Sequence, residues 1–174
     1  MSRFDPLLQR FYHRLGQLYT HVPLLARWWG KRFTAIQSAE IPFVPLRKPL
    51  TQCRLALITT GGVHLVNQTP YDMRDPRGDP SYRAIPADTP PEQLMITHDY
   101  YDHRDADDDL NILLPLERGR ELAQQGHIAA LATCYSFMGH IEPPHVHTLL
   151  TRTAPQVAGK LKQEQVDAVL LTPA

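Results

Sequence analysis

Four short apolar runs, each closed by glycine, proline or polar residues, limit what this chain can fold into. They span residues 53–60, 94–97, 128–133 and 167–172. Runs of this length and character are typical of strands in a sheet that is covered on both faces. Helical patterns at residues 115–126 and 146–162 separate the last three runs. The alternation predicts an α/β domain with a mostly parallel sheet and flanking helices, of the Rossmann or flavodoxin-like type.

The first 49 residues have a different character from the rest of the chain. Apolar residues recur at helical spacing between residues 6 and 32, and Pro23 interrupts them, so two short amphipathic helices are expected. Three prolines within residues 41–49 predict an extended linker. We therefore expect a helical arm and linker over residues 1–49 and the α/β domain over residues 50–174. The arm carries a basic face, yet we expect it to pack on the domain rather than on a membrane.

Charge and cysteine usage exclude several classes of function. The chain has 18 Lys and Arg against 18 Asp and Glu, so no net field favours nucleic acid. No apolar run approaches the roughly 20 residues of a membrane-spanning helix, and the start does not resemble a signal peptide. Cys53 and Cys134 lack the CxxC spacing. These observations predict a cytoplasmic protein, which we also expect to be oligomeric.

The candidate site lies where the strands end, because ligands bind outside the carboxyl ends of the strands in an open parallel sheet. The residues placed there are Gly61, Gly62 and His64, then His98 and Asp99, then Cys134, Tyr135, Ser136 and His140. His64 or His98 could orient a substrate carboxylate or act as a general acid, or each could be a structural histidine. Cys134 could be a nucleophile if a neighbour such as His140 lowered its pKa, or it could be a packed apolar residue.

Substrate contacts are expected from the same loops and from one arginine. Gly61, Gly62, Asp99, Tyr135 and Ser136 are the candidate substrate-binding residues at the strand ends. Arg83 could clamp a substrate carboxylate, or it could form a plain salt bridge. Gly61 and Gly62 lack the GxGxxG spacing, so the sequence does not predict a dinucleotide cofactor.

Three histidines near the third strand form a weak candidate for metal binding. His145 and His147 are two residues apart, a spacing that suits a metal on an extended strand but not on a helix. His140 is the third member of this group. We expect no metal here, and a metal-dependent hydrolase built on these residues is a minor alternative.

Six segments give the sequence a specific resemblance. They are TTGGVHL (59–65), GDPSYRAIP (78–86), ITHDYYD (96–102), DLNILLPLERGRELAQQGHI (109–128), YSFMG (135–139) and DAVLLTPA (167–174). In order and spacing they resemble the selenoprotein B family of glycine, sarcosine, betaine and D-proline reductases, above all the D-proline reductase type. The resemblance implies reductive cleavage of a C–N bond in a small amino acid or amine, coupled to a dithiol and its disulfide. It also implies a substrate activated by a pyruvoyl group on a partner subunit, although the sequence leaves open whether this chain has such a partner.

The family's redox residue has no counterpart in this sequence. In the family, the segment that corresponds to residues 170–174 is followed by selenocysteine or cysteine and then by a second cysteine. We therefore expect no cofactor within this chain, a selenocysteine downstream of Ala174, and a domain that is incomplete at its carboxyl end. The alternative is a short, non-catalytic binding or scaffold paralogue. An incomplete sheet also predicts an exposed apolar patch at residues 169–171.

Overall fold

The structure is a computed structural model that describes residues 44–174. The chain divides into two compact units, Met1–Pro45 and Leu46–Ala174, and the second is the subject here. The predicted helical arm lies outside the described residues. None of the helices in residues 44–174 has the length and apolar character that spanning a bilayer requires.

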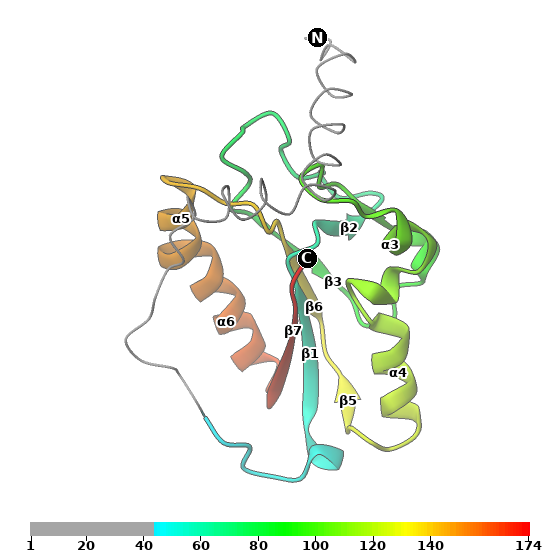
Figure 1. Ribbon diagram of the computed structural model, residues 1–174. Coiled ribbons are helices and arrows are strands. Elements are labelled where there is room, and N and C mark those ends of the chain that lie inside the picture. The colour runs from blue at the N-terminus through cyan, green and yellow to red at the C-terminus, as the bar shows by residue number, and fades with distance from the viewer. Residues whose placement is uncertain (1–43) are drawn as a thin grey trace, which may run out of the picture. The chain divides into compact units, whose positions relative to one another are not determined.

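A five-stranded sheet organises the domain around β1 (Arg54–Thr59). On one side β1 pairs in parallel with β7 (Ala168–Thr172), in a register that runs from Leu55↔Ala168 to Thr59↔Thr172. On its other side β1 pairs in parallel first with β5 (Ala130–Leu131) and then with β6 (Cys134–Phe137). β3 (Tyr82–Ile85) completes the sheet, antiparallel to β6. The mostly parallel sheet that the sequence predicts is confirmed (Figure 1).

The helices flank the sheet on opposite sides, as Figure 1 shows for α4 (Leu116–Gln124) and α6 (Ala154–Gln163). The helix predicted at residues 115–126 corresponds to α4, and the one predicted at residues 146–162 is longer. The second is continuous from α5 (His145–Thr148) through a π-helical segment, η4 (Leu149–Thr153), into α6. Pro155 has no N–H to donate to the preceding turn, which accounts for the wider helical register just before it.

Short helical turns complete the elements. They are η1 (Leu50–Gln52), η2 (Pro91–Gln93), α3 (Arg104–Asp108) and η3 (Leu110–Ile112).

Two apolar clusters fill the space between sheet and helices. One joins Leu57, Ile85 and Cys134 of the sheet to Leu116 of α4. The other joins Tyr135 and Phe137 of β6 to Val157 of α6. Neighbouring residues of β6 thus enter different clusters, because successive side chains of a strand point to opposite faces. All four β6 side chains are buried as a result.

Two strands differ from the sequence prediction. The predicted strand at residues 94–97 is β4 (Leu94–Ile96), which pairs antiparallel with β2 (Val63–Leu65) in a separate two-stranded sheet. Its Met95 is 43% exposed, in keeping with an antiparallel ribbon that keeps one face in solvent. The predicted strand at residues 128–133 shortens to β5, and the chain then forms β6 from residues predicted as a loop.

The outer strand β7 is poorly covered. Val169, Leu170 and Leu171 are 40, 46 and 67% exposed. Among the described residues, β7 pairs only with β1. The predicted exposed patch at residues 169–171 is confirmed.

Candidate functional site

The carboxyl ends of β1, β6 and β7 meet at one edge of the sheet, where backbone contacts join the turns that follow them. Gly62 donates its N–H to the carbonyl of Phe137 at 3.0 Å and accepts the N–H of Thr97 at 3.0 Å. Gly61 forms an isolated β-bridge with Met138. Three segments, residues 60–62, 97–101 and 138–140, are thereby held together. We call them the carboxyl-edge loops.

The chain after β7 reaches the same place. The N–H of Ala174 donates to the hydroxyl of Thr60 at 3.0 Å, and the hydroxyl of Thr172 donates to the carbonyl of Leu113 at 2.6 Å. The residues that follow β1 and β7 are therefore neighbours. This is the convergence of strand ends that the parallel topology leads one to expect.

His98 lies inside the carboxyl-edge loops and is 4% exposed. Its Nε2 faces the N–H of Gly139 at 3.2 Å, and its Nδ1 faces the N–H of Tyr100 at 3.4 Å. Burial, followed by the neighbouring His140 and His103, lowers the pKa of His98 to about 4. The imidazole is therefore neutral at pH 7 and cannot form an ion pair with a substrate carboxylate.

His64, the other candidate histidine, is completely buried. Its Nδ1 lies 2.8 Å from the carbonyl of Leu65, and its Nε2 lies 2.8 Å from the hydroxyl of Thr97. Because a carbonyl only accepts, Nδ1 donates its proton to Leu65. Both ring nitrogens are thus engaged within the small β2–β4 sheet, which favours the structural interpretation of this residue.

Cys134, Tyr135 and Ser136 lie in β6 and not in the loop where the sequence places them. All three are essentially inaccessible to solvent. Burial raises the pKa of the Cys134 thiol to about 11, so it is protonated at neutral pH and packs as an apolar group. The hydroxyl of Tyr135 donates to Glu164 at 3.2 Å. These contacts favour packing roles for this part of the predicted site.

Arg83 holds the connection before β3 in place. Its Nε donates to the carbonyl of Thr69 at 2.7 Å and its Nη2 to that of Pro70 at 3.0 Å. The guanidinium lies 3.8 Å from Asp79 and 4.3 Å from the centre of the Tyr71 ring. Of the two interpretations that the sequence left open, these contacts favour the structural one.

The three histidines of the weak metal candidate make separate contacts. Nε2 of His140 lies 2.9 Å from the carbonyl of Pro76, and Nε2 of His145 lies 2.8 Å from a carboxylate oxygen of Asp75. His147 is exposed on α5. In residues 44–174, no group of three or more His, Cys, Asp or Glu side chains could hold a metal ion.

Two tyrosines of the loop after the predicted strand at residues 94–97 were not among the predicted site residues. The Tyr101 hydroxyl donates to the carbonyl of Gly61 at 2.8 Å, and its ring centre lies 4.7 Å from that of His98. Tyr100, 46% exposed, stacks on His140 with ring centres 4.3 Å apart. Their position directly after His98 and the exposed Asp99 was the available signal, because a ligand of an open parallel sheet binds where the strands end.

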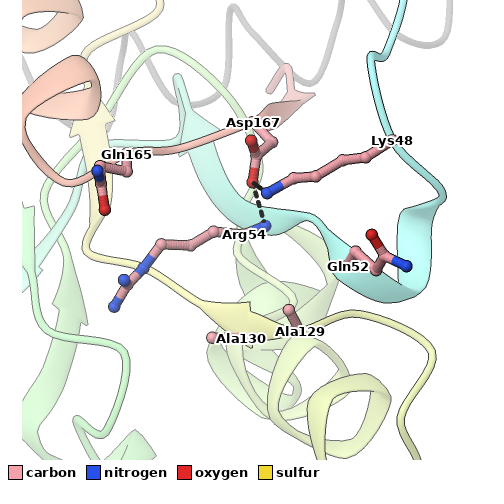
Figure 2. A pocket seen from close by; sticks show the side chains of 7 residues that line it. All are labelled: Lys48, Gln52, Arg54, Ala129, Ala130, Gln165 and Asp167. Atoms are coloured by element: carbon pink, nitrogen blue, oxygen red, sulfur yellow. Dashed lines mark hydrogen bonds and ion pairs between the residues drawn. The ribbon is translucent and has the colours of Figure 1, made fainter.

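An open hollow of about 410 Å³ lies at the opposite, amino end of the sheet. In Figure 2, Asp167 stands between Lys48 and the backbone of Arg54. Its carboxylate accepts from Lys48 Nζ and from the Arg54 N–H, both at 2.8 Å. The negative charge of Asp167 is therefore balanced by Lys48. The residues that line the hollow lie outside the carboxyl-edge loops.

Comparisons with known proteins show the family of this chain. The pattern of the family described as glycine/sarcosine/betaine reductase selenoprotein B matches residues 24–174. The D-proline reductase subunit gamma of Acetoanaerobium sticklandii is 37% identical over 131 residues, which are 75% of this chain and 52% of that protein. The chain thus spans about half the length of this curated relative, and no solved structure matches it. This chain belongs to the glycine/sarcosine/betaine reductase selenoprotein B family.

Proposed function

We propose that this chain forms the substrate side of a reductase site in which a selenol or thiol cleaves a C–N bond of a small amino acid or amine. The observation that carries the proposal is the convergence of the carboxyl-edge loops on Thr60, whose hydroxyl accepts the N–H of Ala174. Family membership supports the reductase class, and the name of the relative supports D-proline as a first substrate to test.

The reaction needs two electrons and two protons. A C–N bond is replaced by one C–H bond and one N–H bond, and a dithiol that becomes a disulfide supplies both electrons and both hydrogens. Cys53 and Cys134 are unsuited to this task, because each is a buried free thiol. The proposal therefore assigns the reactive selenol or thiol to a residue that follows Ala174 in the protein's reading frame.

The exposed side chains of the carboxyl-edge loops define how a substrate would be recognised. Asp99 and Tyr100 are exposed there, beside the half-buried His140. A carboxylate attracts the ammonium group of an amino acid or amine, and the stacked rings of Tyr100 and His140 offer an apolar wall. In this proposal Asp99 attracts the substrate amine, and the fixed turns shape the edge at which the bond breaks.

Three measurements test the proposal. Sequencing the gene beyond the Ala174 codon should reveal a selenocysteine or cysteine codon followed closely by a second cysteine codon. The product of that frame should consume D-proline, glycine, sarcosine or betaine in the presence of a dithiol and, where required, of its partner subunit, with one disulfide formed per C–N bond cleaved. Asp99→Asn should raise KM more than it lowers kcat.

The 174-residue chain serves as the matched control and should show no dithiol-dependent reduction. If the longer product also leaves all four substrates and the dithiol unchanged, the non-catalytic scaffold is the better assignment. A stoichiometric metal ion in the purified protein would instead favour the hydrolase alternative.

A further inference from the structure

His98 lies between the turn that follows β1 and the turn that follows β6. A Cβ atom added to Gly62 would lie 2.8 Å from the Cβ of His98, and one added to Gly139 would lie 3.5 Å from its Nε2. Both turns therefore pack closely against this one side chain. The Gly139 N–H, at 3.2 Å from Nε2, adds a polar contact to the packing.

The two backbone N–H groups that face the imidazole cannot both be accepted. A neutral imidazole has one unprotonated nitrogen, so it accepts one hydrogen bond and donates another. The Gly139 contact at 3.2 Å is shorter than the Tyr100 contact at 3.4 Å. The geometry therefore favours the tautomer in which Nδ1 carries the proton and Nε2 accepts from Gly139. A protonated ring would accept neither N–H.

The groups around His98 come from three packed segments. Tyr101 contacts the ring edge to face at 4.7 Å, and the ring of Tyr100 lies 5.9 Å away. His103 forms an ion pair with Asp107 on α3. The titratable groups that face or flank the imidazole are Asp99, Tyr100, Tyr101, His103, Asp107 and His140.

We propose that His98 is a positioning residue of the site, whose neutral imidazole accepts the Gly139 N–H and holds the turn after β6 against the turn after β1. This inference rests on the proposed function for the identity of the site, but it assigns His98 a role other than general acid. With its lone pair directed at Gly139, the imidazole shapes the edge instead of exchanging protons with a substrate.

Nuclear magnetic resonance of the ¹⁵N-labelled 174-residue chain tests the inference without any activity assay. At pH 7 the His98 ring should show a protonated Nδ1 and an unprotonated Nε2. As the pH falls, the amide signal of Gly139 should shift with the same midpoint as His98, well below that of an ordinary histidine. A protonated Nε2 at pH 7, or a Gly139 signal that ignores the titration of His98, would overturn the proposal.

Two substitutions separate the ring nitrogens. In His98→Gln the amide oxygen can take the place of Nε2, whereas in His98→Asn it takes the place of Nδ1. Amide exchange of Gly139 should stay close to wild type in His98→Gln and should be faster by about tenfold in His98→Asn, as expected for the loss of one hydrogen bond. Equal exchange in the two variants would contradict the proposal.

His103→Gln is the control, because it removes a nearby histidine without touching the Gly139 contact. Its Gly139 exchange should match the wild type. Should a His98 variant fail to fold, the wild-type titration still decides the matter. Since none of these readouts involves reduction, a failed activity assay would count against the proposed function alone.

Discussion

The buried imidazole of His98 makes the stability of the domain depend on pH. The unfolded chain takes up a proton near the ordinary histidine pKa of 6.5, whereas the folded chain holds His98 neutral down to a pKa of about 4. Between these values the unfolded state binds more protons, so the free energy of unfolding decreases as the pH falls from about 6.5 to about 4. Above this window the group contributes no pH dependence.

We predict that this one group lowers the free energy of unfolding by roughly 1–3 kcal/mol across that window. Urea unfolding at pH 7, 5.5 and 4.5 measures the change. His98→Gln cannot titrate and should show a correspondingly flatter dependence, while His103→Gln should follow the wild type more closely. Parallel curves for wild type and His98→Gln would show that the imidazole is already protonated or solvated in the folded chain.

The two cysteines give a second test at the residue scale. Cys53 and Cys134 are the only cysteines of the sequence, and both are fully buried. Burial keeps the Cys134 thiol protonated, and a thiol reacts through its thiolate. We expect the folded chain to react with a thiol reagent at pH 8 at least about a hundredfold more slowly than the urea-unfolded chain. Rapid modification of Cys134 in the folded protein would revive its candidacy as a nucleophile.

At the scale of elements, the turn between β1 and β2 depends on a glycine. Gly62 has a positive φ of 69°, and an added Cβ would lie 2.8 Å from the backbone oxygen of Thr97. Gly126 after α4 also has a positive φ, of 74°, but an added Cβ would meet nothing within 4 Å. An alanine at either position would be strained by the positive φ, but only at Gly62 would its Cβ also clash with neighbouring atoms.

We predict that Gly62→Ala lowers the free energy of unfolding by more than about 2 kcal/mol, and Gly126→Ala by about 1 kcal/mol. Chemical denaturation of both variants at pH 7 provides the comparison. The Gly62 variant should also disturb the His98 and Gly139 signals, whereas the Gly126 variant should not. Equal losses would mean that the β1–β2 turn relaxes without cost.

The sequence predicts the central elements well because apolar runs and helical periodicity are local signals. It places β1, β7 and α4 within one or two residues. It misses β6, because Tyr135 and Ser136 have the polar character of a loop. The Tyr135 hydroxyl is satisfied by Glu164, which lies 29 residues away at the carboxyl end of α6. The sequence also predicts β4 as a strand of the main sheet, whereas β4 pairs with β2. Which strand it pairs with depends on contacts that the apolar run itself does not specify.

For the candidate site, the sequence predicts where some residues lie but not which contacts they make. Ligands of an open parallel sheet bind outside the carboxyl ends of its strands, and His98 and the Gly61-Gly62 turn do lie at that edge. His98 reaches the edge from β4, however, which pairs outside the main sheet. The sequence cannot reveal that Nε2 of His98 faces the N–H of Gly139. Nor can it reveal that Arg83 donates to the carbonyls of Thr69 and Pro70. Those contacts depend on how the loops cross the edge, which only the assembled fold determines.

At the largest scale, that of the whole of residues 44–174, β7 presents an open edge with apolar side chains. Leu171 is 67% exposed, and Val169 and Leu170 are exposed beside it. A strand edge of this kind offers unpaired backbone groups together with apolar surface, a combination that favours pairing with another chain. Leu150, 59% exposed, lies in the helical segment η4 and offers no such edge.

We therefore predict that the 174-residue chain self-associates through β7 and that Leu171→Lys weakens this association by at least about tenfold, because a charge on an edge strand opposes pairing. Leu150→Lys removes a similar exposed leucine from a helix and should leave the association unchanged. Sedimentation velocity over a range of protein concentrations measures both, with chemical denaturation to confirm that each variant is folded. If both lysine variants lower the association equally, general surface hydrophobicity and not the β7 edge drives it; if the wild type remains monomeric at high concentration, the exposed strand does not pair with a second copy.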